Sequence, residues 1–246
     1  MAELRIGVIG AGVMGSGIAQ TLAVAGYETV CCDLAPAALE SAKREVVSGR
    51  FGMESAVARG KLTREAMAAA QARLTWSDSL AMAAAADLIV ECVPERLDLK
   101  IRVFRELDRV AKPTAILASN TSGFSIAALA ASTDRPERVV GWHWASPPPV
   151  MKFAEIVAAE HTSQTTIDTV VEVARGCGKN PVVGKDNAMA WGFVANRVYF
   201  AMIREAQRVV DDGVATREQV NQLMVDCFRW PVGPFALLAG ATSGWK

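Results

Sequence analysis

The chain has 246 residues, of which 51% are hydrophobic and 21% are charged, so it can form a nucleotide-binding domain plus a smaller second domain. Its 26 lysines and arginines balance its 26 aspartates and glutamates, which argues against a polyanionic partner such as nucleic acid. No window is apolar enough to span a bilayer, the N-terminal segment does not resemble a signal peptide, and the five cysteines form no CxxC pair. We therefore expect a cytoplasmic protein with free thiols, no membrane segment and no metal site.

The first predicted elements form a strand–helix–strand unit. An apolar run at 4–9 predicts a buried strand, 13–25 has helical spacing that Gly26 ends, and 29–33 predicts a second strand. Such a unit implies a parallel strand pair with a right-handed crossover. Pro36 begins a long helical region, in which residues 48–75, with a break at Gly60, predict a helical hairpin inserted into the sheet.

Strands and helices alternate through the middle of the chain. Strands are predicted at 88–90, 116–118, 139–143, 154–157 and 181–183, and helices at 97–110, 125–131 and 165–176. This alternation is typical of an α/β fold with a doubly wound sheet of the Rossmann type.

The apolar spacing changes after Lys185. It predicts a long amphipathic helix at 193–210, which Asp212-Gly213 ends, and a further helix from Thr216 to about Cys227. We therefore expect a domain boundary near residue 186, with a nucleotide-binding domain at 1–186 and a smaller all-α domain at 187–246.

A glycine-rich motif, Gly10-Ala11-Gly12-Val13-Met14-Gly15, lies between the first strand and the first helix. Gly10 permits a tight turn, Gly12 lets the backbone approach a pyrophosphate, and Gly15 lets the helix pack against the strand. The free N–H groups of the helix N-terminus would bind the phosphates. Asp33 ends the second strand, where a carboxylate accepts hydrogen bonds from ribose hydroxyls. This combination predicts a dinucleotide site, and the alternative is a glycine-rich packing turn.

Asp33 also favours NAD as the cofactor. A 2′-phosphate of NADP would meet this carboxylate, and no arginine follows at positions 34–38 to bind it. FAD is the alternative cofactor, because it uses the same turn.

The chain contains two histidines. His161 lies in a polar stretch and is expected at the surface. His143 ends an apolar strand, at the edge where open α/β sheets bind their ligands. The residues alone leave two interpretations of His143, a catalytic acid–base or a buried structural histidine.

Five stretches of the chain resemble the 3-hydroxyacyl-CoA dehydrogenase family in order and spacing: 7–17, 91–100, 119–122, 139–157 and 182–197. The match over 135–143, which ends at His143, is especially specific. The resemblance implies NAD-dependent oxidation of an L-3-hydroxyacyl-CoA to a 3-oxoacyl-CoA, as in fatty acid β-oxidation. It also implies a homodimer, whose second domain binds substrate and forms the dimer contacts.

The same resemblance implies a role for individual catalytic residues. His143 would remove the proton of the substrate hydroxyl, and Glu155 would orient its imidazole and stabilise the imidazolium. Ser122 would bind the substrate oxygen, and Asn196 would help to bind the reacting carbonyl and the nicotinamide side. Glu155 could instead be a surface acid, Ser122 a helix cap and Asn196 a solvated helix residue.

Three further residues, Glu95, Lys100 and Asn120, would line the cofactor by the same resemblance. The alternative for Glu95 and Lys100 is an exposed pair on a helix, and for Asn120 a helix cap.

The chain departs from the family pattern at three places. Ser146 stands where the family has an asparagine, and the loop 187–193 is longer and carries Trp191, which suggests a bulky or aromatic acyl group. The family pattern continues for several helices beyond Phe235, so we expect a truncated second domain. These departures keep two alternatives open, a dehydrogenase of a non-CoA hydroxy acid and a non-catalytic NAD-binding protein.

Overall fold

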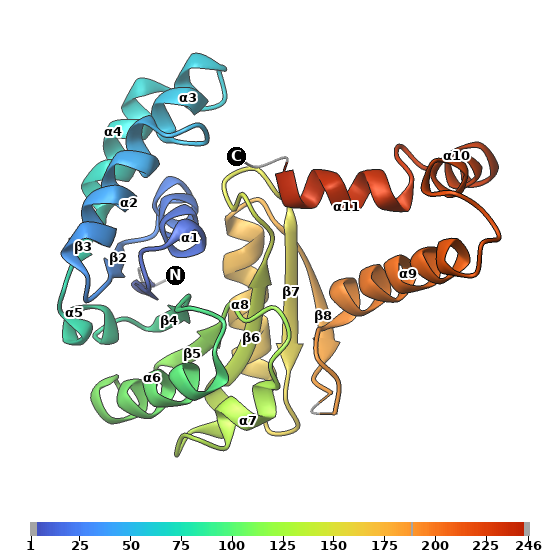
Figure 1. The fold of residues 1–246 in the computed structure, drawn as a ribbon. Coiled ribbons are helices and arrows are strands. Elements are labelled where there is room, and N and C mark those ends of the chain that lie inside the picture. Colours follow the sequence, from blue (N-terminus) through green and yellow to red (C-terminus); the bar gives the residue numbers. More distant parts are fainter. Residues whose placement is uncertain (1–3, 188, 244–246) are drawn as a thin grey trace. The chain divides into compact units, whose positions relative to one another are not determined.

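The computed structural model describes residues 4–187 and 189–243, and the chain divides into two compact units, Met1–Trp191 and Gly192–Lys246. Within the described residues, the N-terminal unit contains an eight-stranded sheet in the order β3-β2-β1-β4-β5-β6-β7-β8 (Figure 1). Every neighbouring pair is parallel except β6 and β7, which are antiparallel. The strands are β1 (Ile6–Ile9), β2 (Thr29–Cys32), β3 (Leu74–Ser77), β4 (Leu88–Glu91), β5 (Ile116–Ser119), β6 (Val139–Trp144), β7 (Phe153–Ala158) and β8 (Asn180–Lys185).

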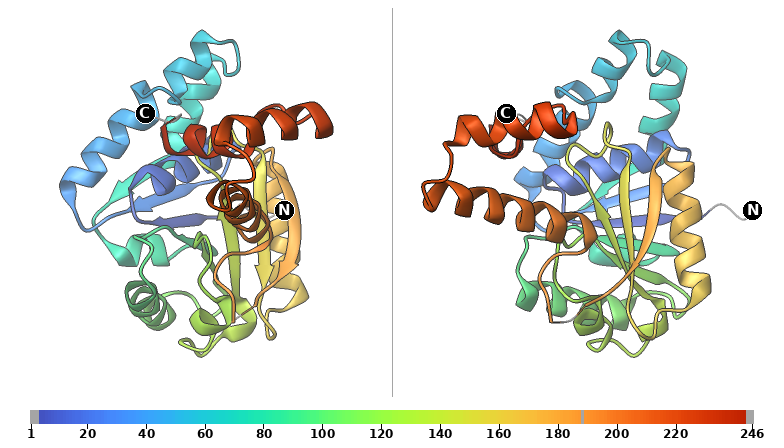
Figure 2. Two further views of the ribbon diagram at one scale, coloured as in Figure 1. Left: turned by 45° about the vertical axis from the view of Figure 1, so that its right-hand side comes forward. Right: turned by 90° about the vertical axis from the view of Figure 1, so that its right-hand side faces the viewer.

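Helices cover both faces of this sheet. Helices α1 (Val13–Val24) and α8 (Gln164–Gly176) lie on one face, and α5 (Leu80–Ala84), α6 (Leu97–Val110) and α7 (Ile126–Ala130) lie on the other (Figures 1 and 2). The order of the strands reverses between β1 and β4, so the sheet is doubly wound. The predicted Rossmann-type fold is confirmed, and ligands of such folds bind at the carboxyl ends of the strands beside this reversal.

The predicted insertion lies between β2 and β3 and consists of α2 (Pro36–Ser48), α3 (Met53–Ala58) and α4 (Arg64–Arg73). Gly60 separates α3 from α4 with a φ of +66°, and the Thr63 hydroxyl accepts a hydrogen bond from the Ala66 N–H at the start of α4. The sequence predicts a helical hairpin throughout residues 48–75, and the edge strand β3 and the short helix α5 are elements that it did not predict.

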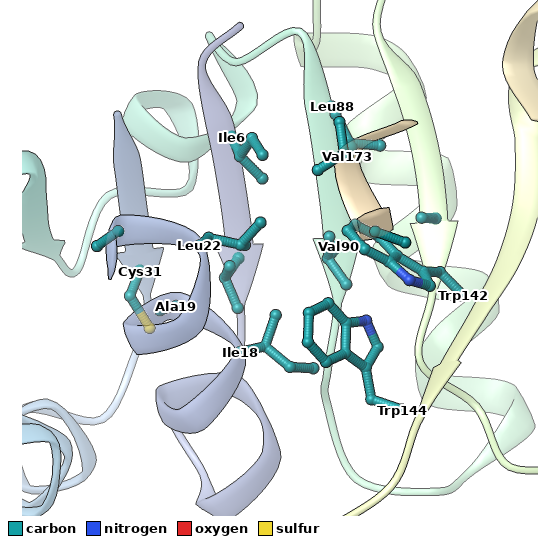
Figure 3. Close-up of a cluster of buried hydrophobic side chains, with 14 of the residues drawn as sticks. Ile6, Ile18, Ala19, Leu22, Cys31, Leu88, Val90, Trp142, Trp144 and Val173 are labelled. Atoms are coloured by element: carbon teal, nitrogen blue, oxygen red, sulfur yellow. The ribbon is translucent and has the colours of Figure 1, made fainter. Parts of the chain in front are cut away.

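The main core lies between the sheet and the pair of helices α1 and α8. Ile18 and Leu22 of α1 are fully buried there, together with alternate side chains of the central strands (Figure 3). Trp142 and Trp144 contribute the largest side chains, and their ring centroids lie 4.9 Å apart. Complete burial of an aliphatic side chain contributes about 1.5–3 kcal/mol to the free energy of unfolding. The packing of α1 and α8 on the sheet therefore stabilises the central strands and β6.

The side chains on the two faces of strand β6 have different roles. Trp142 and Trp144 point into the core, so His143 between them points to the opposite face. In the antiparallel register of β6 and β7, His143 is paired directly with Glu155. Directly opposed residues of an antiparallel pair share one face, so the backbone pairing brings these two side chains together.

The turn after β1 requires glycine at two positions. Gly10 has a φ of +103°, a backbone conformation that L side chains rarely adopt. Gly15 in the first turn of α1 packs against this turn, and a Cβ atom built on it would lie 1.8 Å from the Gly10 carbonyl oxygen. Helix α1 can therefore begin immediately after β1 only with glycine at both places.

The C-terminal unit is helical, as predicted. It consists of α9 (Val194–Asp211), α10 (Arg217–Phe228) and α11 (Pro234–Ser243). Thr216 and Gln219 form a capping box at the start of α10. A small core of Ala206, Val220 and Phe235 packs the three helices together. Among the described helices of the whole chain, none combines the length and the apolar character that crossing a bilayer requires.

Substitution of Gly15 by alanine should destabilise the N-terminal unit by about 3 kcal/mol or more, because the added methyl group overlaps backbone that cannot move away. Gly12→Ala is the matched control, since nothing lies within 4 Å of the position of its Cβ, and it should cost less than about 1 kcal/mol. Urea unfolding of both variants measures the difference, and equal stabilities would contradict the packing argument.

Candidate active site

A cavity of about 720 Å³ opens at the carboxyl ends of β1, β2, β4 and β5 in the N-terminal unit. It brings together nearly all of the predicted cofactor residues, and Ser122 lies in its wall as well. Gly15 is buried behind the turn and does not line it. The predicted residues in the lining are Gly10, Gly12, Val13, Met14, Asp33, Glu95, Lys100, Asn120 and Ser122.

The start of α1 presents backbone donors to this cavity. Gly12 is the N-cap residue, and no side chain accepts a hydrogen bond from the first turn of α1. The N–H groups of such a turn have no partner within the helix and favour an anion. Because the space where a Gly12 Cβ would lie is open, a phosphate can approach the backbone closely.

Asp33 is held at the end of β2 by the backbone. Its Oδ2 accepts a hydrogen bond from the Ala11 N–H at 2.8 Å, and its Oδ1 accepts one from the Ala35 N–H at 2.9 Å. These contacts fix the carboxylate beside the glycine turn. Each carboxylate oxygen can accept a further hydrogen bond, so the group can still bind ribose hydroxyls.

The cavity lining also includes the apolar side chains of Leu34, Leu99 and Val103. An apolar slot beside a helix N-terminus and a carboxylate suits the base, phosphates and ribose of a dinucleotide. Cys32 and Cys92 also line the cavity, and burial raises the pKa of both thiols, that of Cys32 to about 11, so both are neutral.

His143 and Glu155 form a buried pair on the face of the sheet that β6 and β7 share. The His143 Nδ1 lies 2.9 Å from the Glu155 Oε2, and both side chains are largely buried. The Phe153 ring packs edge-on against the imidazole, with the ring centroids 5.2 Å apart. A carboxylate at Nδ1 orients the imidazole and stabilises its protonated form, so this pair can take up and release a proton through Nε2.

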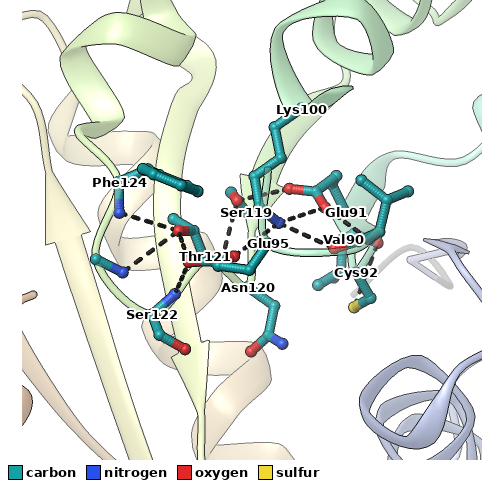
Figure 4. Close-up of polar contacts among 12 residues, drawn as sticks. Val90, Glu91, Cys92, Glu95, Lys100, Ser119, Asn120, Thr121, Ser122 and Phe124 are labelled. Atoms are coloured by element: carbon teal, nitrogen blue, oxygen red, sulfur yellow. Dashed lines mark hydrogen bonds and ion pairs between the residues drawn. The ribbon is translucent and has the colours of Figure 1, made fainter. Parts of the chain in front are cut away.

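The segment after β5 is held by Glu95. The Glu95 Oε1 accepts hydrogen bonds from the Thr121 hydroxyl at 2.6 Å and from the Ser122 N–H at 2.9 Å (Figure 4). The adjacent helix α7 is capped by Ser125, whose hydroxyl accepts a hydrogen bond from the Ala128 N–H. The position of Ser122 therefore depends on Glu95, while α7 has its own cap.

Lys100 lies behind Glu95 and is almost completely buried. Its ammonium contacts Glu91 Oε1 at 2.8 Å and Glu95 Oε2 at 3.2 Å. Burial raises the pKa of the Glu91 carboxyl, and the Lys100 ammonium is the strongest of the contacts that oppose this rise. Glu91 was not among the predicted site residues, although an acid in the otherwise apolar strand β4 is a signal in the sequence.

Asn120 connects two strand ends. Its side-chain Oδ1 accepts a hydrogen bond from the Trp144 N–H at 2.9 Å, so the end of β5 is joined to the end of β6 beside His143. Glu95 is thus hydrogen-bonded to the segment after β5, which carries both Asn120 and Ser122. Asn196, the remaining predicted residue, lies on α9 in the C-terminal unit and is half-buried.

Within residues 4–187 and 189–243, no three side chains of histidine, cysteine, aspartate or glutamate are grouped so that they could hold a metal ion.

Comparison with known proteins identifies both units. Residues 5–187 match the family model described as "3-hydroxyacyl-CoA dehydrogenase, NAD binding domain", and residues 192–245 match "3-hydroxyacyl-CoA dehydrogenase, C-terminal domain". A probable 3-hydroxybutyryl-CoA dehydrogenase of Bacillus subtilis is 39% identical over 95% of this chain and 79% of its own length.

Solved structures agree with these matches. The (S)-3-hydroxybutyryl-CoA dehydrogenase of Ralstonia eutropha is 36% identical, with a TM-score of 0.90 over 95% of this chain and 81% of that one. A relative with a different substrate name, the 5-formyl-3-hydroxy-2-methylpyridine 4-carboxylate 5-dehydrogenase of Mesorhizobium japonicum, is 36% identical over 95% of this chain and 74% of its own length. The chain therefore belongs to the 3-hydroxyacyl-CoA dehydrogenase family.

Proposed function

We propose that this protein oxidises an L-3-hydroxyacyl-CoA to the 3-oxoacyl-CoA with NAD, and that His143 and Glu155 form its acid–base pair. The observation that carries the proposal is the buried contact between the His143 Nδ1 and the Glu155 Oε2, on the strand that follows the cofactor-binding strands. The names of the matched relatives, which include 3-hydroxybutyryl-CoA dehydrogenases, support the same reaction.

Each of the proposed catalytic residues has its own role in this reaction. The His143 Nε2 accepts the proton of the substrate hydroxyl as the carbon–oxygen double bond forms, and Glu155 stabilises the resulting imidazolium. Ser122 donates a hydrogen bond to the same oxygen, and Asn196 helps to bind the reacting carbonyl. The bound nicotinamide supplies the acceptor for the hydride that leaves the substrate carbon.

The N-terminal unit contains groups that fit NAD. The first turn of α1, including Val13 and Met14, would bind the pyrophosphate, and Asp33 would bind the adenosine ribose. Glu95, Asn120 and Lys100 line the same cavity and would lie along the cofactor. The Asp33 carboxylate disfavours the 2′-phosphate of NADP.

A second candidate is a dehydrogenase of a non-CoA 3-hydroxy acid. The name of the Mesorhizobium japonicum relative gives a pyridine carboxylate rather than an acyl-CoA as its substrate, and that relative is about as similar to this chain as the acyl-CoA enzymes are. Ser146 and the loop that carries Trp191 differ from the family pattern, which also suits an aromatic or bulky group. Turnover of short and aromatic 3-hydroxyacyl-CoAs, and of the corresponding free acids, distinguishes these substrates.

Three expectations from the sequence remain predictions. The protein is expected to be a cytoplasmic homodimer, residues 1–186 are expected to form its cofactor-binding domain, and residues 187–246 are expected to form its substrate and dimerisation domain.

Replacing His143 by glutamine should lower kcat for acetoacetyl-CoA reduction by about 10²–10⁴-fold, because a general acid–base contributes that much to proton transfer. NADH binding should stay within about twofold, since His143 does not line the nucleotide cavity. Stopped-flow turnover and NADH fluorescence titration measure the two effects.

The exposed second histidine supplies the matched control. His161→Gln should retain full activity because its side chain is outside the site. Full turnover by the His143 variant would contradict the proposal. A native protein that binds NADH tightly but turns over neither acetoacetyl-CoA nor a free hydroxy acid would favour the non-catalytic alternative.

Replacing Asp33 by asparagine should raise the Kd for NADH about tenfold, as expected for the loss of a charge-assisted hydrogen bond of about 1.4 kcal/mol. The Kd for NADPH should rise less or fall, because the repulsion of the 2′-phosphate is removed. Glu106→Gln is the control, since Glu106 is a second carboxylate in the cavity wall and pairs with Arg109. An unchanged ratio of the NADH and NADPH affinities in the Asp33 variant would place the adenosine elsewhere.

A further inference from the structure

Lys100 is a buried cation that contacts two carboxylates and a backbone carbonyl of the N-terminal unit. Its side chain is 1% exposed, although it forms part of the cavity wall. The ammonium contacts Glu91 Oε1 at 2.8 Å, Glu95 Oε2 at 3.2 Å and the Val93 carbonyl oxygen at 3.2 Å. The contacts with Glu91 and with the Val93 carbonyl are hydrogen bonds, and the contact with Glu95 is an ion pair. Lys100 is therefore placed to organise the protein around it.

Lys100 is linked to Thr121 and Ser122 through Glu95. This glutamate lies in the turn before α6, and its side chain is 36% exposed. A side chain with that much freedom loses rotamer entropy when it is fixed. Because Lys100 holds the Oε2 atom, the Oε1 atom faces the Thr121 hydroxyl and the Ser122 N–H (Figure 4).

Lys100 is also linked to Thr121 through Glu91 and Ser119. The Glu91 Oε2 accepts a hydrogen bond from the Ser119 hydroxyl at 2.7 Å. The Ser119 Oγ in turn accepts one from the Thr121 N–H at 3.1 Å. The Lys100 ammonium is thus connected to the backbone of Thr121 and Ser122 from two directions (Figure 4).

We propose that Lys100 is a positioning residue, which fixes the backbone at Thr121 and Ser122 through Glu95 and through Glu91 and Ser119. In this role it sets the place of the Ser122 hydroxyl relative to the substrate oxygen. The catalytic part of this inference rests on the role of Ser122 in the proposed function. The structural part concerns only the order of the segment after β5.

The chain offers a matched control at the other end of α6. Arg135 pairs with Asp108 through its Nε at 2.6 Å, and both side chains are 12% exposed. Lys100 connects the first part of α6 to the segment after β5, and Arg135 connects the last part of α6 to the segment before β6. Loss of either pair weakens the packing of α6, but only Lys100 is bonded to the carboxylates that hold Ser122.

The first measurement is hydrogen exchange of the backbone amides at 119–124 in variants that bind NADH. Lys100→Met should accelerate exchange there by about tenfold or more, because opening of the segment then no longer has to disturb the ion pairs of Lys100 with Glu91 and Glu95. Glu95→Gln should accelerate exchange to a smaller extent. Glu91→Gln combined with Lys100→Met removes the uncompensated carboxylate and serves where the single variant does not fold. Arg135→Met should leave exchange at 119–124 unchanged.

The second measurement is a double-mutant cycle on turnover of acetoacetyl-CoA. Lys100→Met should lower kcat about tenfold or more, since small displacements of positioning groups have effects of that size. In a Ser122→Ala background the same substitution should change kcat less than about twofold, because the hydroxyl that Lys100 positions is already absent. A purely structural role would give equal effects in the two backgrounds.

The outcomes separate this inference from the proposed function. Unchanged exchange at 119–124 in the Lys100 variants overturns the inference whatever the substrate is. Equal effects of Lys100→Met with and without the Ser122 hydroxyl overturn its catalytic part. Accelerated exchange in a native enzyme that does not act on acetoacetyl-CoA supports the structural part and counts against the substrate proposed above.

Discussion

The antiparallel pairing of β6 with β7 is the constraint on which the candidate acid–base pair depends. Each other neighbouring pair in the described sheet is parallel, and this one reversal sets His143 opposite Glu155. A slip of one residue would move one partner to the other face of the sheet, where Trp142 and Trp144 fill the core. The burial of the two indole rings therefore also specifies the register of the pair.

Lys179 stabilises the loop that makes this reversal. Its ammonium donates hydrogen bonds to the carbonyl oxygens of Pro148 and Met151 at 2.6 and 2.8 Å and lies 5.0 Å from the Trp144 ring centroid. Burial lowers the pKa of Lys179, yet carbonyl oxygens and an aromatic face favour the charged form. Two buried lysines thus contact neighbouring segments: Lys100 contacts the carboxylates that bind the segment after β5, and Lys179 binds the loop after β6.

The sequence could predict those parts of the site that depend on local rules. Gly10 and Gly15 are needed by one turn, Asp33 follows a strand that alternation and apolar character identify, and Thr216 begins a helix with a capping box. Each of these features is decided within a few neighbouring residues. The family resemblance supplied His143 and Glu155, whose pairing no local pattern could have shown because twelve residues and a loop separate them.

The missed elements were decided by tertiary contacts. Strand β3 begins directly after the alanine-rich helix α4 and gains its partner β2 from a distant part of the chain. Its pairing with β2 across the helical insertion, rather than a local pattern, makes it a strand. Lys100 was taken from the resemblance as a cofactor residue, but its almost complete burial between Glu91 and Glu95 is a property of the packed structure, since neither carboxylate is a helical neighbour of it.

The hydrogen bond between Asn120 and Trp144 joins these parts into one arrangement. Ser122 is fixed to β4 and α6 by Glu95 and Lys100, while His143 is fixed to β7 by Glu155. The Asn120 amide joins the two groups because it connects the end of β5 directly to the backbone beside His143. His143, Ser122 and the nucleotide cavity are therefore held within the N-terminal unit by backbone pairing and buried charge. One sheet thus positions both the cavity and the His143–Glu155 pair, whereas Asn196 lies on α9 in the C-terminal unit.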